Sequence, residues 1–342
     1  VIPPDTATPT KSPAASLTPV LQPTIISLPT RTIRSTPTAT LLPTAIVPPT
    51  AIVPPTATVP PTAVLPQMAT LPPTAVITVT PNRQPSATPP SDNDADGLAA
   101  VIGFSAGGRP LTTYQFGSGP NQIVLVGGMH GGYEWNTIVL AYQMIDYFTQ
   151  NPNAIPEEVT LHIIPAANPD GQFETVGKNG RFTAADIDPQ SNHFSGRFND
   201  KGVDLNRNWD CGWQPTAVWR DQPISAGAYP FSEPETVLLR DLFLALQPTA
   251  VIFWHSAANG AYGAGCPELY PPAYELAQLY GVAADYPVHE SFDSYQVTGD
   301  ASDWLAQQGI PAITIELKTH EILEWEKNLA GVTAVLHASQ TP

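Results

Sequence analysis

The pattern of apolar and polar positions divides the chain into two parts. From about residue 98 onward, short apolar runs with strand-like alternation take turns with segments whose apolar residues recur every three or four positions. The predicted strands cover residues 122–126, 159–163, 250–254 and 311–317, and the predicted helices cover residues 134–148, 232–246, 274–280, 300–308 and 322–336. Strands that alternate with helices indicate an α/β fold.

Residues 1–90 follow neither pattern. They contain 22 of the 40 prolines and 20 threonines, and a Pro-Pro-Thr-Ala near-repeat recurs between Leu42 and Ile77. Because proline fixes φ and removes a backbone donor, neither helix nor sheet can propagate through such a segment. We therefore predict a disordered Pro/Thr-rich spacer or stalk over residues 1–92 and one folded domain over residues 93–342.

Charge separates the same two parts. Residues 1–90 hold four basic and one acidic residue, which leaves 10 basic against 29 acidic residues for the remainder. A domain this acidic is not expected to bind nucleic acid. Residues 92–97 match the first half of a calcium-binding loop, but Gly103 stands where such a loop needs a glutamate. We interpret them as the acidic end of the spacer.

Export is expected from the composition of the spacer. The chain begins at Val1 without a basic and apolar leader, so we expect that a signal segment has already been removed. No uninterrupted apolar run reaches membrane-spanning length, so no transmembrane segment is predicted. The sequence therefore predicts an extracellular or cell-surface protein, which we expect to be a monomer.

Four polar features stand at or near the ends of predicted strands. They are His130 with Glu134 after residues 122–126, the turn at residues 168–171, His255 after residues 250–254, and Glu316 within residues 311–317. In open α/β sheets such strand ends converge on one site. Two histidines and one glutamate form the ligand set of a catalytic zinc, which leaves one position for water. Glu316 is then the candidate base, since a carboxylate in an apolar strand is costly without a partner.

Two further features lie between the strands. The segment from Arg197 to Asn208 holds two arginines and three asparagines among apolar positions, which suits a planar anion such as a carboxylate; a solvated charged loop is the alternative. Cys211 and Cys266 are the only cysteines, and each follows one of the motifs. If the motifs converge, the two thiols are neighbours and can form a disulfide; the alternative is two buried free thiols.

The sequence resembles the zinc metallocarboxypeptidase family, which includes carboxypeptidase A-like enzymes and bacterial murein peptide amidases. The resemblance covers essentially all of residues 98–340. It rests on six motifs in the family's order, namely Gly127-Gly128-Met129-His130 with Glu134, Asn168-Pro169-Asp170-Gly171, Gly202-Val203-Asp204-Leu205-Asn206-Arg207-Asn208, His255-Ser256, Tyr295-Gln296 running to Asp303-Trp304, and Ile315-Glu316-Leu317. It implies a three-layer α/β/α fold around a mixed, twisted sheet of about eight strands.

The resemblance also implies a metal site and a base. His130, Glu134 and His255 would bind one Zn²⁺ per chain, and Asp204 would orient His130. Glu316 would be the general base toward a zinc-activated water. The family usually has two residues between the first histidine and the glutamate, whereas three stand here, and two of these are glycines that can absorb the extra residue.

Substrate-binding residues follow from the same resemblance. Asn206, Arg207 and Tyr295 would hold the terminal carboxylate of a peptide. Arg197 would polarise the scissile carbonyl, with Arg181 as the alternative. Ser302 would lie at the bottom of the pocket for the terminal side chain, with Asp300 two residues before it. This pair favours a basic or amphoteric residue such as lysine or diaminopimelate.

We therefore predict a secreted zinc metallocarboxypeptidase that hydrolyses the C-terminal bond of a peptide or of a peptidoglycan-derived peptide. One alternative is a zinc amidase or deacylase acting on peptidoglycan stem peptides or acylated amino acids. Another is a non-catalytic module that binds peptides or cell wall. Modules of that kind usually lose the base or a metal ligand, and this sequence has both.

Overall fold

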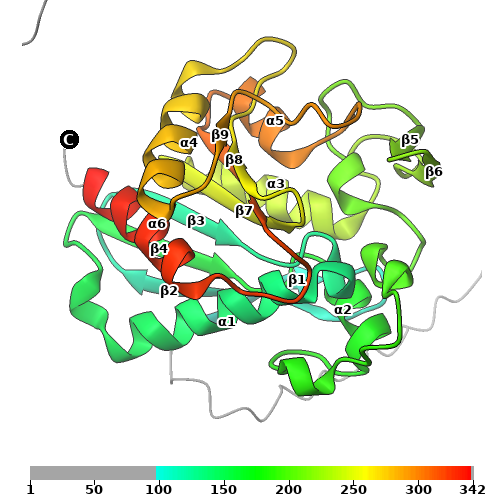
Figure 1. Cartoon of the computed structure of the whole chain (residues 1–342), viewed down its shortest axis with the longest axis horizontal. Helices are drawn as coiled ribbons and strands as arrows, with labels where there is room; N and C mark the ends of the chain where they lie inside the picture. The colour runs from blue at the N-terminus through cyan, green and yellow to red at the C-terminus, as the bar shows by residue number, and fades with distance from the viewer. Residues whose placement is uncertain (1–97, 340–342) are drawn as a thin grey trace, which may run out of the picture. The chain divides into compact units, whose positions relative to one another are not determined.

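The structure, a computed structural model, describes residues 98–339 of the chain (Figure 1). Its centre is an eight-stranded mixed sheet in the order β1-β2-β4-β3-β7-β10-β8-β9. The strands are β1 (Ala99–Phe104), β2 (Pro110–Gly117), β3 (Asn121–Val126), β4 (Val159–Ile164), β7 (Ala250–Ser256), β8 (Gly260–Tyr262), β9 (Val288–His289) and β10 (Ala312–Leu317). The predicted α/β fold with about eight strands is confirmed. The predicted spacer over residues 1–92 lies outside the described residues.

The four central strands, β4, β3, β7 and β10, run parallel to one another. Every residue of β4 and β7 is buried, as expected for parallel strands that are covered on both faces. In the register of β7 and β10, His255 pairs directly with Glu316. The carboxyl ends of these strands share one edge of the sheet, which is why polar residues distant in sequence meet there.

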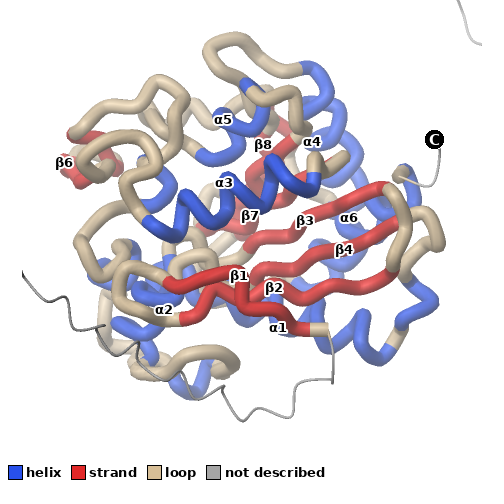
Figure 2. Tube along the Cα trace, turned by 180° about the vertical axis from the view of Figure 1, so that it is seen from behind, coloured by secondary structure: helices blue, strands red, loops and turns tan. Residues whose placement is uncertain are grey.

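Helices cover both faces of the sheet. Helices α1 (Trp135–Gln150), α4 (Pro271–Ala284) and α6 (Trp325–Ala338) share one buried apolar cluster with it, and α3 (Pro234–Leu246) and α5 (Ala301–Gln307) share the other. Figure 1 shows α1 and α6 in front of the sheet, and the reverse view in Figure 2 shows α3 in front of it. The implied three layers are therefore present.

The first predicted helix, residues 134–148, is confirmed, and α1 begins within one residue of the predicted start. Residues Gly131–Glu134 form a 3-10 turn, and α1 starts at Trp135. Gly131 has a φ of +47°, and a Cβ on it would lie 2.5 Å from the carbonyl oxygen of Gly196. Only glycine fits a left-handed position this close to another backbone. The turn takes up the third residue between His130 and Glu134.

A long excursion between the 3-10 turn Leu205–Arg207 and α3 carries a hairpin that the sequence pattern did not predict. Its strands are β5 (Thr216–Trp219) and β6 (Gln222–Ser225). A disulfide joins Cys211, at the start of the excursion, to Cys266 in the segment after β8, with the two Cα atoms 6.1 Å apart. The two motifs that precede these cysteines therefore lie close together.

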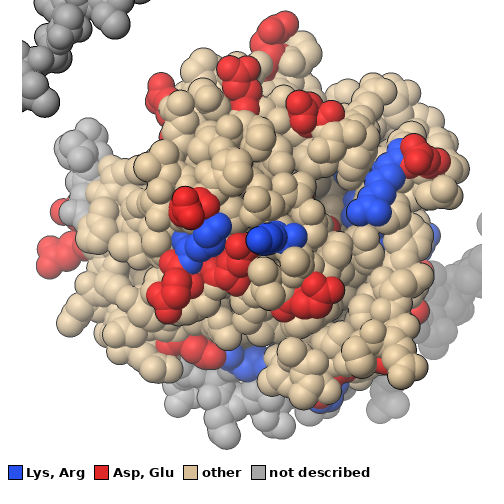
Figure 3. Space-filling model, in the orientation of Figure 1, with Lys and Arg blue, Asp and Glu red and all other residues tan. Residues whose placement is uncertain are grey.

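The outer surface carries scattered charges. On the face drawn in Figure 3, Lys and Arg side chains stand singly or in small groups beside Asp and Glu. Within residues 98–339, no helix has the length and apolar character that a bilayer crossing requires.

Candidate active site

Three side chains from two elements meet at the carboxyl edge of the sheet. His130 precedes the 3-10 turn after β3, Glu134 is the last residue of that turn, and His255 belongs to β7. Nδ1 of His130 lies 2.7 Å from Oε1 of Glu134. Nδ1 of His255 lies 3.0 Å from Oε2 of Glu134 and 3.1 Å from Nδ1 of His130. All three side chains are buried, and their ligand atoms lie within 4.8 Å of one another, so the group can hold a metal ion.

The donor atoms of this group suit a cation. Two imidazole nitrogens 3.1 Å apart bring their lone pairs together unless a proton or a metal ion lies between them. Nε2 of His130 is buried, makes no hydrogen bond within the described residues, and lies 3.4 Å from Oδ1 of Asp204. A proton on that nitrogen leaves the lone pair of Nδ1 free for a metal. Two imidazole nitrogens and a carboxylate match the ligand preference of zinc.

The charges of the group are fixed by its neighbours. Burial disfavours the carboxylate form of Glu134, but His130 and His255 outweigh burial and hold the pKa of Glu134 well below its usual range. Burial alone would lower the pKa of His255, whereas Glu134 outweighs it and raises that pKa. Glu134 is therefore ionised at neutral pH, and the group offers one negative charge and two imidazoles to a divalent cation.

Asp204 connects His130 to Arg197. Its Oδ2 accepts a hydrogen bond of 2.7 Å from Nε of Arg197, while its Oδ1 faces His130. Burial opposes the charge of Asp204, but Arg197 and then His130 outweigh it and hold the pKa of Asp204 far below its usual range. Nη1 of Arg197 lies 3.9 Å from Glu134, and its buried Nη2 has no hydrogen-bond partner in the described chain. Arg197 can therefore still donate to a ligand.

Glu316 stands beside the metal-ligand group on β10. Its Oε2 accepts a hydrogen bond of 3.1 Å from the backbone N–H of Ala258. Burial, and next the negative charge of Glu134, raise the pKa of Glu316 to about 7. A cation held by the imidazoles would offset the charge of Glu134 and favour the ionised form. A carboxylate whose pKa is close to neutrality can both accept and release a proton.

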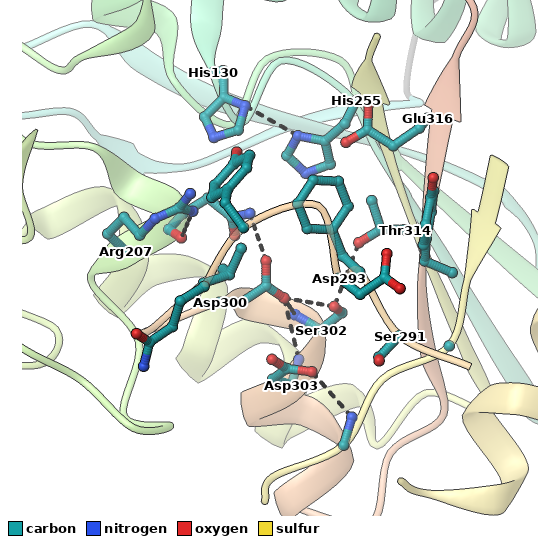
Figure 4. A pocket seen from close by; sticks show the side chains of 18 residues that line it. His130, Arg207, His255, Ser291, Asp293, Asp300, Ser302, Asp303, Thr314 and Glu316 are labelled. Atoms are coloured by element: carbon teal, nitrogen blue, oxygen red, sulfur yellow. Dashed lines mark hydrogen bonds between the residues drawn. The ribbon is translucent and has the colours of Figure 1, made fainter. Parts of the chain in front are cut away.

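A cavity of about 370 Å³ opens in front of this group. Figure 4 shows His130, His255 and Glu316 at one end of it, with Asp300, Ser302 and Asp303 together at the other. Arg207 lies on one side between the two ends, and Tyr295 also lines the cavity. We call the end with the histidines the metal end and the end with the aspartates the acidic end.

Arg207 places a buried cation in the cavity wall. Its side chain is only 2% exposed, and its Nη1 donates to the backbone oxygen of Asn206 at 2.7 Å. Its Nε has no hydrogen-bond partner, and no carboxylate of the described residues pairs with it. Nδ2 of Asn206 donates one hydrogen bond, at 2.7 Å, to Asp300, which leaves its second hydrogen for a ligand.

The acidic end is built around the start of α5. Asp300 caps this helix, since its Oδ1 accepts from the backbone N–H groups of Ser302 and Asp303 at 2.8 and 3.3 Å. Oγ of Ser302, which is 5% exposed, donates to the same oxygen at 2.6 Å. Burial, and next the charge of Asp300, raise the pKa of Asp303 to about 7. Asp300 therefore caps its helix and lines the cavity at once.

Comparison with known proteins decides the family. The sequence model of the zinc carboxypeptidase family matches residues 98–330, which is nearly the whole of the described domain. This chain belongs to the zinc carboxypeptidase family. Members of the family depend on zinc, and His130, Glu134 and His255 form a group in this chain that can hold a metal ion. The chain is therefore a hydrolase of a zinc-dependent peptidase family.

The relatives of this chain include proteins named as carboxypeptidases and proteins named as murein peptide amidases. Carboxypeptidase B of Astacus astacus is 28% identical over 249 residues, which make up 65% of this chain and 80% of that protein. Murein peptide amidase A of Escherichia coli K12 is 31% identical over 140 residues, 38% of this chain and 54% of that protein. The crystal structure of carboxypeptidase A from Helicoverpa armigera matches with a TM-score of 0.56 at 18% identity, over 70% of this chain and 68% of that one. The match thus spans about half the length of the amidase.

Some residues near the site were not expected from the sequence. His320, which the sequence gave no reason to place there, lies with its ring 4.7 Å from that of Tyr133, the residue before Glu134. Trp219 of the unpredicted hairpin also packs on Tyr133, at 5.7 Å between ring centroids. The position of His320 four residues after Glu316, just beyond a strand end, was the only available signal. Arg181, the alternative to Arg197, pairs with Asp146 at 2.9 Å on the outer side of α1.

Proposed function

We propose that this protein is a zinc-dependent carboxypeptidase that hydrolyses the peptide bond before a C-terminal residue. The observation that supports it most is Arg207, a buried guanidinium with no carboxylate partner in the described chain, which shares one cavity with His130, His255 and Glu316. A buried charge without a partner is costly. The terminal carboxylate of a peptide supplies that partner, with Tyr295 and the free amide hydrogen of Asn206 as further donors.

The residues at the metal end divide the reaction between them. When bound by His130, Glu134 and His255, zinc supplies Lewis acidity, which polarises a carbonyl and lowers the pKa of water. Glu316 accepts the proton of the attacking water and passes it to the leaving amine. Arg197, oriented by Asp204, donates hydrogen bonds to the carbonyl oxygen as negative charge develops on it.

The acidic end receives the side chain of the terminal residue. Ser302 lies at its base, and the carboxylates of Asp300 and Asp303 attract an ammonium group. Lysine and diaminopimelate carry such a group, whereas a large apolar side chain would desolvate these carboxylates without supplying a cation. We therefore propose a peptide substrate that ends in a basic or amphoteric residue.

A second candidate is a zinc amidase or deacylase that acts on peptidoglycan stem peptides or acylated amino acids. The similarity to murein peptide amidase A favours it, and so does the acidic end of the cavity. Diaminopimelate carries an ammonium and a carboxylate in one side chain, so Arg207 and the acidic end can serve that reaction as well. The two candidates differ in the bond that is cleaved, and not in the roles of the residues.

A free carboxylate on the substrate is expected to be essential. An acylated Ala-Lys peptide should release lysine, and the same peptide with a C-terminal amide should react at least about 100-fold more slowly, because it leaves Arg207 unpaired. The measurement is kcat/KM for the two peptides, with an acyl-γ-glutamyl-diaminopimelate peptide beside them to test the second candidate. Equal values for acid and amide would refute the proposed role of Arg207.

The acidic end is expected to set the preference for the terminal residue. Peptides ending in lysine or diaminopimelate should exceed those ending in alanine or phenylalanine by tens-fold in kcat/KM, since one such contact discriminates by about 1 to 3 kcal/mol. Asp300→Asn, which keeps a good helix cap, and Ser302→Ile should each reduce the ratio. Asp285→Asn, at the exposed end of α4, is the matched control. A preference for phenylalanine, or a ranking that neither variant alters, would contradict the assignment.

A further inference from the structure

A second cavity, of about 420 Å³, opens on the other side of Glu316. It shares Glu316, Tyr295 and Phe292 with the cavity of Figure 4, so the two are arms of one cleft that meet at the proposed base. We call it the second arm. Its own lining includes Tyr133 of the 3-10 turn Gly131–Glu134, Trp219 and Arg220 of the β5–β6 hairpin, and His320 of the segment after β10.

The wall of the second arm is aromatic. The ring of Tyr133 packs edge-on against that of Trp219 at 5.7 Å and lies 4.7 Å from that of His320. The ring of Phe194 also packs against that of Trp219, with 5.0 Å between the ring centroids. The hairpin therefore brings Trp219 and Arg220 to the cleft through packing, and its position does not depend on a single contact. Such a wall offers flat faces to an extended peptide.

The charge of the second arm is opposite to that of the acidic end. The guanidinium of Arg220 lies 4.7 Å from the centre of the Trp219 ring, at the exposed turn of the hairpin. No carboxylate of the described residues forms an ion pair with it. Burial lowers the pKa of His320, and the charge of Arg220 acts in the same direction. His320 is therefore neutral at neutral pH, and Arg220 is the cation that lines this arm. Nδ1 of His320 is buried and has no hydrogen-bond partner among residues 98–339.

We propose that the second arm binds the residue on the amino-terminal side of the scissile bond, and that Arg220 selects a carboxylate there. The direction in which the peptide runs through the cleft rests on the proposed function. That function places the terminal carboxylate at Arg207 and the scissile carbonyl beside Glu316, so the rest of the peptide leaves the cleft through the second arm. The preferred substrate is then a peptide in which an acidic residue precedes a terminal residue that bears an ammonium group.

The test compares two peptides that differ only before the scissile bond, acyl-Ala-Glu-Lys and acyl-Ala-Gln-Lys. The wild-type enzyme should favour the glutamate peptide by about two- to five-fold in kcat/KM, the size expected of an exposed charge pair, and high salt should reduce this ratio. Arg220→Gln should bring the ratio close to one, and Arg220→Glu should favour a peptide with lysine at that position. Arg240→Gln is the matched control, since Arg240 also lies over an aromatic ring, that of Phe231, but away from the cleft.

A binding measurement keeps the test independent of turnover. Calorimetry with analogues of both peptides, in which a methylene-amine link replaces the scissile amide, should show the same Arg220-dependent ratio. Equal binding and equal kcat/KM for the two peptides in wild type and Arg220→Gln would overturn the proposal and leave the carboxypeptidase intact. Arg220-dependent binding without any cleavage would instead support the second arm and refute the proposed reaction. A ratio that falls equally in Arg240→Gln would also overturn it.

Discussion

Replacing Glu316 by glutamine is expected to lower kcat by about 10² to 10⁴-fold while zinc stays bound. The amide keeps the size of the side chain and can still interact with the N–H of Ala258, but it cannot accept the proton of the attacking water. Because Glu316 is not one of the three ligand side chains, the metal content should not change. The measurements are kcat on acyl-Ala-Lys and zinc per chain in the same preparation.

The matching control is Glu326→Gln, which makes the same change on the exposed first turn of α6. It should match the wild type in both measurements. Loss of zinc from Glu316→Gln would show that Glu316 is a ligand rather than the base. Full activity in that variant would show that another group takes the proton.

Replacing Glu134 by alanine is expected to abolish both zinc and activity. Glu134 lies within 3.0 Å of Nδ1 of both histidines and supplies the only negative charge among the three ligand side chains. After dialysis the variant should hold less than about one tenth of the zinc of the wild type, which should hold one ion per chain. Metal analysis and kcat on acyl-Ala-Lys measure the two effects.

Two further variants separate loss of metal from loss of structure. Glu134→Gln removes the charge and keeps the volume of this buried side chain, so it should fold and still lose zinc. Glu157→Ala, on the exposed loop before β4, should change neither quantity. If Glu134→Ala holds a full complement of zinc and full activity, the extra residue after His130 has moved the ligand and the assignment is wrong.

The fold could be predicted from the sequence because buried parallel strands give continuous apolar runs that are easy to recognise. Residues 250–254 form a continuous apolar run, as a strand covered on both faces must, and every residue of β7 is buried. The amphipathic period of residues 134–148 predicted α1 to within one residue at its start. The form of the turn before α1, a 3-10 turn, depends on the close approach of Gly131 to the backbone of Gly196, a tertiary contact that no local pattern contains.

The site was predictable where its residues stand at strand ends. His255 and Glu316 pair directly on the adjacent parallel strands β7 and β10. Because both stand near the carboxyl ends of their strands, the sequence pattern already indicated that their side chains lie close together. The double role of Asp300, as helix cap and as part of the cavity wall, was harder to predict from the sequence. A capping pattern reports a hydrogen bond to the first turn of a helix and carries no information about what lies on the other side of the carboxylate.

The second arm of the cleft could not be predicted. Trp219 and Arg220 lie in a short hairpin whose strands have four residues each, and short strands have little periodicity. Their approach to Tyr133 depends on ring packing between segments far apart in the chain. His320 lies in the segment between β10 and α6, and its only signal in the sequence was its position shortly after the end of a strand.

The most direct test of zinc-dependent hydrolysis at a free C-terminus is the rate of lysine release from acyl-Ala-Lys by one preparation in three states. The states are the protein as purified, the protein after chelation, and the chelated protein with one equivalent of Zn²⁺ restored. The expected result is activity that falls by at least about 100-fold on chelation and returns with zinc. With zinc bound, activity on the C-terminal amide should be at least about 100-fold lower than on the acid. Activity that survives complete removal of the metal, or that is equal on the acid and the amide, would contradict it.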